Sequence, residues 1–219
     1  GNNFRRAIEE GIPHPIELEE YSNYTIGLRL LAGALNIPFM PTKSLLGSDL
    51  PVYNKMIKEM EDPYSGERVA LVPAANPDVA IVHVSRADQK GNAQIEGFSS
   101  NAENMARAAK HTIITCEEIV STEEIMRYPN LTIIPQYAVD AVVELPYACH
   151  PWNFPYAYAY DITFHAMQLE AFKTREGFLK WLDEWCFAFD SWEGYLVKVG
   201  YGRLDKLRRI ERRFTRSSL

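Results

Sequence analysis

The sequence predicts an α/β fold with an open, mostly parallel sheet flanked by helices and followed by C-terminal helices. One observation is the alternation of strand and helix patterns between residues 79 and 145. A second is Val79–Val84, which is almost continuously apolar and β-branched, as expected of a strand covered on both faces. A third is the ordinary composition, 47% hydrophobic and 24% charged over 219 residues. We therefore expect one domain over residues 1–219.

The N-terminal part is expected to alternate helices with short extended pieces. In Tyr21–Leu35 apolar residues recur every three to four positions, and small residues such as Gly27 and Gly33 allow close packing. A proline in the first turn favours a second helix over Pro51–Glu61. The other elements expected here are a short helix, an extended segment, a loop and a strand: Phe4–Glu10, Ile37–Pro41, Lys43–Leu50 and Arg68–Val72.

The strand beginning at Val79 is followed by a turn that carries polar groups. Asp88–Asn92 contains turn-forming residues, and Ala93–Ile95 resumes an extended run. Ligands of parallel sheets bind beyond the carboxyl ends of strands, so this loop is expected at the working edge. Its polar residues are His83, Ser85, Arg86, Asp88 and Asn92. A plain strand–loop–strand connection is the alternative.

The region after this turn is expected to continue the alternation. A helix over Ala102–Lys110 precedes a buried strand over Thr112–Cys116, and a helix is expected over Glu117–Tyr128. In that helix Glu117 and Glu118 would favour the N-terminus electrostatically; a catalytic role is the alternative, as it is for Glu96. Two further strands are expected at Leu131–Ile134 and Ala138–Leu145.

The C-terminal part differs in kind. Residues 146–160 combine three prolines with six aromatic residues, which predicts an irregular loop that must be covered by this chain or by a partner. Three helices are expected in residues 161–200, at Asp161–Ala171, Arg175–Phe187 and Ser191–Val199. The basic tail, residues 203–219, carries seven basic and two acidic residues between Arg203 and Arg216. A solvated or frayed end is expected there, with a phosphate-binding patch as the alternative.

Charge and cysteine content exclude several classes of protein. A formal net charge of −6 argues against general nucleic-acid binding, and no apolar run is long enough to cross a membrane. The three cysteines fit neither a metal site nor a disulfide framework, which favours a reducing, cytoplasmic location. Cys116 and Cys186 are expected in the core, and Cys149 beside His150 is a weak nucleophile candidate. No phosphate loop, nucleophile elbow or paired-histidine signature is present.

Four motifs in order resemble family I CoA-transferases, specifically the A (alpha) subunits of the glutaconate type. The first two are Asp78–Val84 with Ala87-Asp88-x-x-Gly91-Asn92, and the segment 106–120 that contains Thr-Cys-Glu-Glu. The others are Ile-Pro-Phe-Met-Pro followed by Gly47-Ser48, and residues 139–143 leading to Pro-Tyr-Ala-Cys-His-Pro. The resemblance runs from about Arg5 to about Leu204. A strand and a glycine-rich loop that open such subunits are missing before Phe4, and the basic tail also departs from the pattern.

The resemblance implies a subunit of a heteromeric enzyme that moves CoA between an acyl-CoA and a carboxylic or dicarboxylic acid. It places the nucleophilic glutamate on a beta subunit, so no catalytic nucleophile is expected in this chain, and CoA is substrate rather than bound cofactor. Donors for an oxyanion and for the substrate carboxylate are then expected here. The candidates are Gly47, Ser48, His83, Arg86, Asn92 and His150. The alternatives are a CoA-ester hydrolase or decarboxylase on the same scaffold, or a non-catalytic ligand-sensing or scaffolding subunit.

Overall fold

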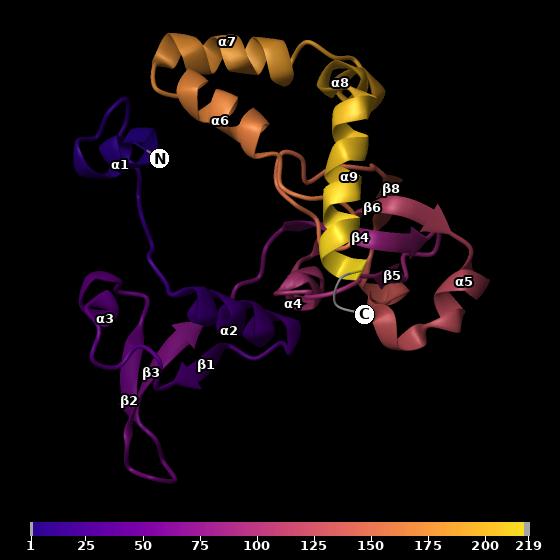
Figure 1. The fold of residues 1–219 in the computed structure, drawn as a ribbon. Helices are drawn as coiled ribbons and strands as arrows, with labels where there is room; N and C mark the ends of the chain where they lie inside the picture. The colour runs from indigo at the N-terminus through magenta and orange to yellow at the C-terminus, as the bar shows by residue number, and fades with distance from the viewer. Residues whose placement is uncertain (1, 217–219) are drawn as a thin grey trace. The chain divides into compact units, whose positions relative to one another are not determined.

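The computed structural model describes residues 2–216, which form two compact units (Figure 1). The sheet unit comprises residues 18–95 and 99–144, and the helical unit comprises residues 2–17, 96–98 and 145–216. The sequence patterns predict one domain and do not indicate this division. No helix in the described part of the chain is long and apolar enough to span a membrane.

The sheet unit contains two sheets with helices between their strands. The three-stranded sheet is antiparallel, in the order β1-β3-β2. The five-stranded sheet has the order β7-β5-β4-β6-β8. The bounds are α2 Asn23–Ala34, β1 Phe39–Thr42, α3 Leu50–Tyr53, β2 Lys58–Glu61, β3 Arg68–Pro73, β4 Val79–Asp88, β5 Ala93–Gln94, α4 Ala102–Ala108, β6 His111–Val120, α5 Thr122–Arg127, η1 Pro129–Leu131, β7 Thr132–Ile134, η2 Gln136–Ala138 and β8 Ala141–Glu144.

The five-stranded sheet is mixed. Strands β4, β6 and β8 run parallel, whereas β5 pairs antiparallel with both β4 and β7. The parallel part places the carboxyl ends of β4 and β6 side by side, with His83 opposite Thr115 and Arg86 opposite Glu118. The α/β class with flanking helices is confirmed, and the parallel arrangement is confined to these three strands.

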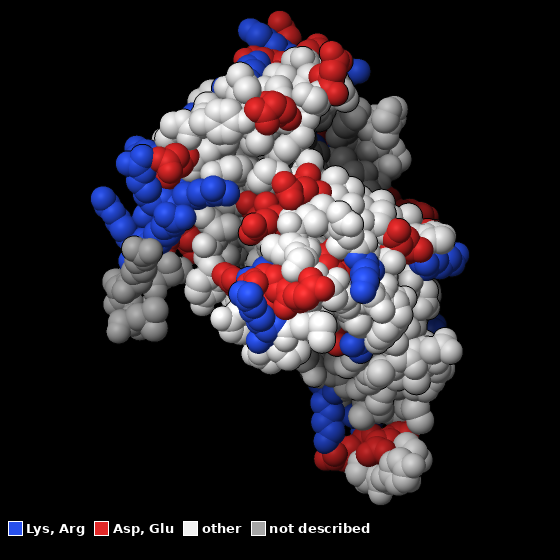
Figure 2. Space-filling view, turned by 90° about the vertical axis from the view of Figure 1, so that its right-hand side faces the viewer, with Lys and Arg blue, Asp and Glu red and all other residues white. Residues whose placement is uncertain are grey.

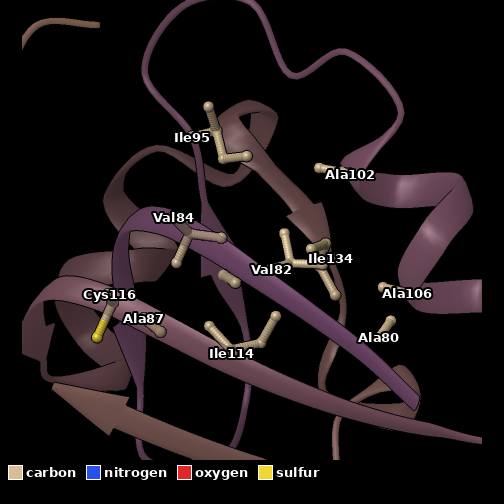
Figure 3. Close-up of a cluster of buried hydrophobic side chains, with 11 residues drawn as sticks. Ala80, Val82, Val84, Ala87, Ile95, Ala102, Ala106, Ile114, Cys116 and Ile134 are labelled. Atoms are coloured by element: carbon tan, nitrogen blue, oxygen red, sulfur yellow. The ribbon is translucent and has the colours of Figure 1, made fainter. Parts of the chain in front are cut away.

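Alternate side chains of β4 differ in burial. Ala80, Val82 and Val84 belong to the main core cluster of the sheet unit, where α4 covers one face of the sheet (Figure 3). The intervening Val79 and Ile81 are 51% and 64% exposed. The prediction that this strand is covered on both faces was therefore wrong for its first half, because the small alanines of α4 pack against one face only.

Two predicted helices are partly strand in the structure. Residues 117–120 continue β6, and Ser121 caps α5 by accepting a hydrogen bond from the backbone N–H of Glu124. The capping residue therefore starts the helix at Thr122, five residues later than expected. The helix predicted over Pro51–Glu61 shrinks to α3, and its second half forms β2, which pairs with β3.

Helix α2 packs closely against neighbouring backbone at Gly33. A Cβ atom built on Gly33 would lie 2.1 Å from the carbonyl oxygen of Ala75 and 3.0 Å from the Cβ of Ala108 in α4. Only a residue without a side chain fits this approach, as the small residues of the sequence predict.

The helical unit is built around an aromatic core. Its helices are α1 Asn2–Glu9, α6 Ile162–Ala171, α7 Arg175–Trp185, α8 Trp192–Val199 and α9 Tyr201–Arg216. The three helices predicted in residues 161–200 are thus present. The core contains Phe164 of α6, Trp181 of α7 and Leu196 of α8.

The basic tail folds as helix α9, so the expectation of a frayed end was wrong for residues 203–216, whereas Lys206, Arg209, Arg212 and Arg213 are solvent-exposed. Leu204 and Leu207 are buried, and Arg203 forms an ion pair with Asp161. Residues 217–219 lie outside the described residues. Figure 2 shows a group of Lys and Arg side chains at the left of the face that it draws.

Residues 146–160 form no helix or regular strand, as predicted. Tyr147, Phe154 and Tyr158 are buried in the core of the helical unit, so this chain itself covers much of the loop. Trp152 remains 56% exposed.

One of the two cysteines expected in the core is buried, and the other is not. Cys116 is buried as predicted. Cys186 is exposed because it lies just beyond the end of α7, so that prediction was wrong.

Candidate functional site

The parallel strands β4 and β6 bring His83 and Glu117 together. The imidazole Nε2 lies 2.8 Å from Glu117 Oε1, and Nδ1 lies 2.9 Å from the Thr115 hydroxyl. Both side chains are nearly enclosed, at 10% and 9% exposed. A carboxylate only accepts hydrogen bonds, so in a neutral imidazole the proton lies on Nε2 and Thr115 donates to Nδ1. Such a pair can hold or transfer a proton.

Sequence patterns did not reveal this pair. Thirty-four positions separate its members, and Glu117 was expected at the start of a helix. The alternation of β6 places Thr115 and Glu117 on the same face, and the register places Thr115 opposite His83. A correct strand assignment for residues 117–120 would have indicated the pair.

Arg86 is held within the sheet unit by Gln94. Its Nε donates to Gln94 Oε1 at 2.8 Å, and its guanidinium lies 5.8 Å from the centre of the Tyr128 ring. Gln94 is fully buried and donates to the carbonyl oxygens of Ile125 and Tyr128. These contacts connect β4 to the segment around α5, so they give Arg86 a structural role.

Asn92 organises the turn after β4. The Asp88 carboxylate accepts hydrogen bonds from the backbone and side-chain amides of Asn92, and Asn92 Oδ1 accepts from the backbone N–H of Gln136. Burial alone would raise the pKa of Asp88, but these hydrogen bonds lower it below its usual value. Gly91 has a φ of +98°, and an added Cβ would lie 2.8 Å from that of Val139. Asn92 therefore stabilises the turn between β4 and β5, as expected if this segment is a plain strand–loop–strand connection.

Gly47 and Ser48 lie in an exposed loop after β1 of the three-stranded sheet. The Ser48 hydroxyl donates to the carbonyl oxygen of Leu45 at 2.8 Å. Leu45 is buried and anchors the loop. The described residues show no backbone hydrogen bond from the N–H of Gly47, which leaves that group available as a donor.

His150 belongs to the helical unit, and its ring is enclosed there. Nε2 donates to Asp161 Oδ2 at 3.2 Å, and the Tyr195 hydroxyl donates to Nδ1 at 2.7 Å. Burial lowers the pKa of His150, so the imidazole is neutral near pH 7. The side chain is 0% exposed, and both of its nitrogens are occupied.

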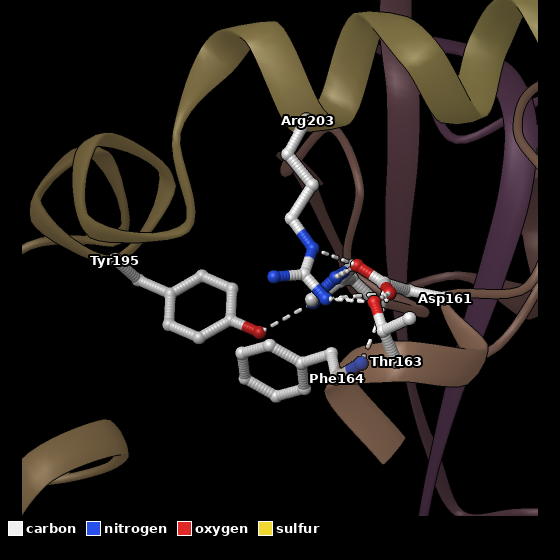
Figure 4. Close-up of polar contacts among 6 residues, drawn as sticks. Asp161, Thr163, Phe164, Tyr195 and Arg203 are labelled. Carbon is white, nitrogen blue, oxygen red and sulfur yellow. Dashed lines mark hydrogen bonds and ion pairs between the residues drawn. The ribbon is translucent and has the colours of Figure 1, made fainter. Parts of the chain in front are cut away.

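Asp161 joins three elements of the helical unit (Figure 4). Its carboxylate accepts from the backbone N–H of Phe164 and from the Thr163 hydroxyl, which caps α6. Arg203 of α9 pairs with both carboxylate oxygens and also donates to Thr163 at 2.6 Å. Arg203 was expected in the solvated tail, so its place in this cluster was not predicted.

The six residues predicted for the site lie in three places. His83, Arg86 and Asn92 follow one another along β4 and its turn. Gly47 and Ser48 lie in the loop after β1 of the three-stranded sheet, and His150 lies in the helical unit. Within residues 2–216 no group of three or more His, Cys, Asp or Glu side chains is arranged to hold a metal ion.

The structure therefore defines an α/β protein whose parallel strands carry a histidine–carboxylate pair. A profile of the coenzyme A transferase family matches residues 2–145. The A subunit of glutaconate CoA-transferase from Acidaminococcus fermentans is 36% identical over 221 residues, covering 94% of this chain and 68% of that protein. The chain belongs to the coenzyme A transferase family.

Solved structures and other relatives agree with this assignment. The crystal structure of the Acidaminococcus fermentans enzyme gives a TM-score of 0.87, at 36% identity, over 93% of this chain and 68% of that chain. The A subunit of 3-oxoadipate CoA-transferase from Pseudomonas knackmussii is 34% identical, over 91% of this chain and 70% of that protein.

Two further similarities bear on length and on alternative activities. An uncharacterised protein of Archaeoglobus fulgidus is 44% identical over 94% of this chain, but the chain spans only 46% of that protein. The structure of a variant of the decarboxylase AibA/AibB gives a TM-score of 0.69 at 30% identity, over 83% of this chain and 64% of that chain.

Proposed function

We propose that this chain is the alpha-type half of a heteromeric CoA-transferase that moves CoA between an acyl-CoA and a carboxylic or dicarboxylic acid. The observation that carries the proposal is the 36% identity to the A subunit of glutaconate CoA-transferase, which extends over 94% of the chain. A second relative with a transferase name is likewise an A subunit. Both names imply a second, different subunit.

The chemistry divides one difficult exchange into steps that share a carboxylate nucleophile. A glutamate of the partner attacks the thioester carbonyl, the C–S bond breaks, and CoA thiolate leaves behind a mixed anhydride. The thiolate then attacks the glutamyl carbonyl and releases the acyl group as a carboxylate. The acceptor carboxylate takes CoA by the reverse sequence, so atoms and charge balance without an oxidant or reductant.

This chain contributes groups that stabilise charge and hold protons. The N–H of Gly47 is a candidate donor to a developing oxyanion, and the hydroxyl of Ser48 could join it only by giving up its hydrogen bond to the carbonyl oxygen of Leu45. The His83–Glu117 pair is a candidate for holding or transferring a proton beside the carboxylate that is released or enters. Arg86, Asn92 and His150 are committed to contacts within their own units, and we assign them supporting roles.

The test is a mass measurement on the assembled protein. The heteromer is purified from its own source and incubated with an acyl-CoA but no acceptor, and its component chains are then weighed under denaturing, acidic conditions. The partner chain should gain the mass of CoA less one water, and this chain should not change. Hydroxylamine should remove the adduct, because it cleaves thioesters. An adduct on this chain, or assembly of this chain with itself alone, would overturn the proposal.

The alternative with a specific observation in its favour is decarboxylation on the same scaffold, because a decarboxylase is among the similar structures. Its identity is 30%, below that of the glutaconate enzyme. A decarboxylase or a CoA-ester hydrolase would form product without any acceptor acid. Turnover that strictly requires an acceptor carboxylate distinguishes the transferase from both.

A further inference from the structure

The helical unit contains a cavity that the proposed CoA transfer does not use. Its volume is about 570 Å³, within the range of roughly 300–1,000 Å³ that is usual for small-molecule sites. Helices α6, α7 and α8 and the segment between α7 and α8 contribute its walls. The aromatic residues that line it are Phe164, Trp181, Trp185, Phe189, Trp192 and Tyr195.

The rings are arranged as two stacked pairs. Trp181 and Trp185 stack with centroids 5.6 Å apart, and Trp192 and Tyr195 stack with centroids 4.7 Å apart. Phe164 meets both rings of the first pair edge-on. Ring faces carry negative quadrupole potential, so those faces that the pairs do not turn toward one another can attract an occupant with positive charge spread over an apolar body.

The chain between the end of α7 and the start of α8 is acidic, although the cations Lys198 and Arg203 already lie against three of the cavity's rings, Trp185, Phe189 and Phe164. Residues 183–193 contain four acidic residues and no lysine or arginine. One of the four, Asp190, lines the cavity, is exposed, and makes no hydrogen bond or ion pair with the described residues. The Tyr195 hydroxyl donates its proton to His150, so its oxygen keeps acceptor capacity.

The chain's own Lys198 already uses two of these rings. Its ammonium nitrogen lies 4.4 Å from the centre of the Trp185 ring and 5.7 Å from that of Phe189. It also pairs with Glu184 at 3.1 Å. An ammonium group is therefore stable against rings of this cavity.

We propose that the aromatic cavity binds a small organic cation of the quaternary ammonium class. The rings supply cation–π attraction to the methyl groups, and Asp190 supplies the opposite charge at the rim. This site lies entirely in the helical unit and is independent of the CoA-transfer proposal.

The test compares choline with its neutral carbon isostere, in which a tert-butyl group replaces the trimethylammonium group. Three of the four tryptophans line the cavity, so tryptophan fluorescence of the purified protein reports occupancy. Choline should change the fluorescence saturably, and its affinity should exceed that of the isostere by about tenfold, as cation–π attraction predicts. The same change should persist in Trp152→Phe, which removes the tryptophan outside the cavity.

Two variants separate a cation site from a merely apolar one. Asp190→Asn should weaken choline about threefold to tenfold, whereas Glu176→Gln, an exposed change on α7 away from the cavity, should leave it unchanged. Lys198→Met should strengthen choline, because it removes a competing positive charge from two rings of the site. Equal affinity for choline and the isostere, no saturable signal, or an Asp190→Asn variant that binds normally would each overturn the proposal.

Discussion

The His83–Glu117 pair of the sheet unit and the His150–Asp161 pair of the helical unit contain the same chemical groups in different surroundings. The first joins two parallel strands, and its imidazole is held by Thr115 and Glu117. In the second, Arg203, Thr163 and the N–H of Phe164 also bind the carboxylate, and Tyr195 occupies the other imidazole nitrogen.

The two pairs differ in what else binds them: Thr115 holds the imidazole of His83, whereas Arg203 and the N–H of Phe164 hold the carboxylate of Asp161. Burial lowers the pKa of His150, and it alone would raise the pKa of Asp161, but hydrogen bonds from Arg203 and Phe164 hold that carboxyl well below its usual range. The neutral His150 and the ionised Asp161 therefore have a structural role, because Asp161 connects residue 150 with helices α6 and α9. His83 lies within residues 2–145, which match the coenzyme A transferase profile, whereas His150 lies outside them, so we take His83 as the candidate for the reaction.

The largest effect is expected from Asp161→Asn. The substitution leaves the partly buried guanidinium of Arg203 without its counter-charge and weakens the cap of α6. Breaking a buried charge pair costs about 3–5 kcal/mol, so the free energy of unfolding measured in urea should fall by that amount. Asp205→Asn, which removes the exposed pair with Arg209, should change it by no more than about 0.5 kcal/mol. Equal losses in the two variants would contradict the comparison.

The next effect concerns His83→Gln in the assembled enzyme. If His83 holds or transfers a proton during CoA exchange, kcat should fall about 100-fold, the lower end of the range for general acid–base groups. The free energy of unfolding should change by only about 1 kcal/mol, the usual net value of a hydrogen bond. His111→Gln is the matched control, because His111 lies on the neighbouring strand β6 and forms an exposed pair with Asp140. Normal kcat in His83→Gln would refute a role in the reaction.

A smaller effect is expected from pH. The folded pKa of His150 lies below its unfolded value of about 6.5, so the unfolded chain binds more protons at mildly acidic pH. Stability from this residue is fully present above that pH and is lost as pH falls through the folded pKa. The folded pKa of Asp161 is also lowered, so further stability is lost below about pH 4.

The urea midpoint should therefore decrease from pH 7.5 to pH 5, and His150→Gln should flatten this slope. His14→Gln, an exposed change, serves as the control. A pH dependence that persists in His150→Gln but disappears in His14→Gln would show that His14 causes it, which would contradict the prediction.

The smallest effects are expected from replacing the threonine beside each pair, Thr163 or Thr115. Thr163→Val removes a hydrogen bond to Arg203 and should lower the free energy of unfolding by about 1 kcal/mol without changing kcat/KM. Thr115→Val removes the hydrogen bond to His83, and it should reduce kcat severalfold with a similar or smaller change in stability. The same loss of kcat in both variants would show that the two pairs do not differ in function.

The sequence predicted those parts of the fold that depend on local periodicity and caps. The three C-terminal helices begin where Asp161, Thr174 and Ser191 accept hydrogen bonds from backbone amides in their first turns. Gly33 was predicted to allow close packing, and the structure places it against Ala75 and Ala108. Such signals lie within a few residues of the feature that they specify.

Features that depend on register could not be predicted in this way. Residues 117–120 have a helical local pattern with charged residues, yet pairing with β4 makes them strand. The His83–Glu117 contact, the exposed face at Ile81 and the helix at the basic tail all follow from tertiary packing, which overrides weak local preference. The four family motifs predicted the protein class because they occur in the same order as in the family. They do not show which of their residues contact one another.

The contrast between Cys116 and Cys186 has a practical consequence for chemical labelling. Burial raises the pKa of the Cys116 thiol to about 11, so almost none of it is thiolate at neutral pH. Cys186 is exposed and lies at the edge of the aromatic cavity. A thiol-specific reporter should therefore attach far faster at Cys186 than at Cys116, which would place a spectroscopic probe beside the cavity without any engineered cysteine.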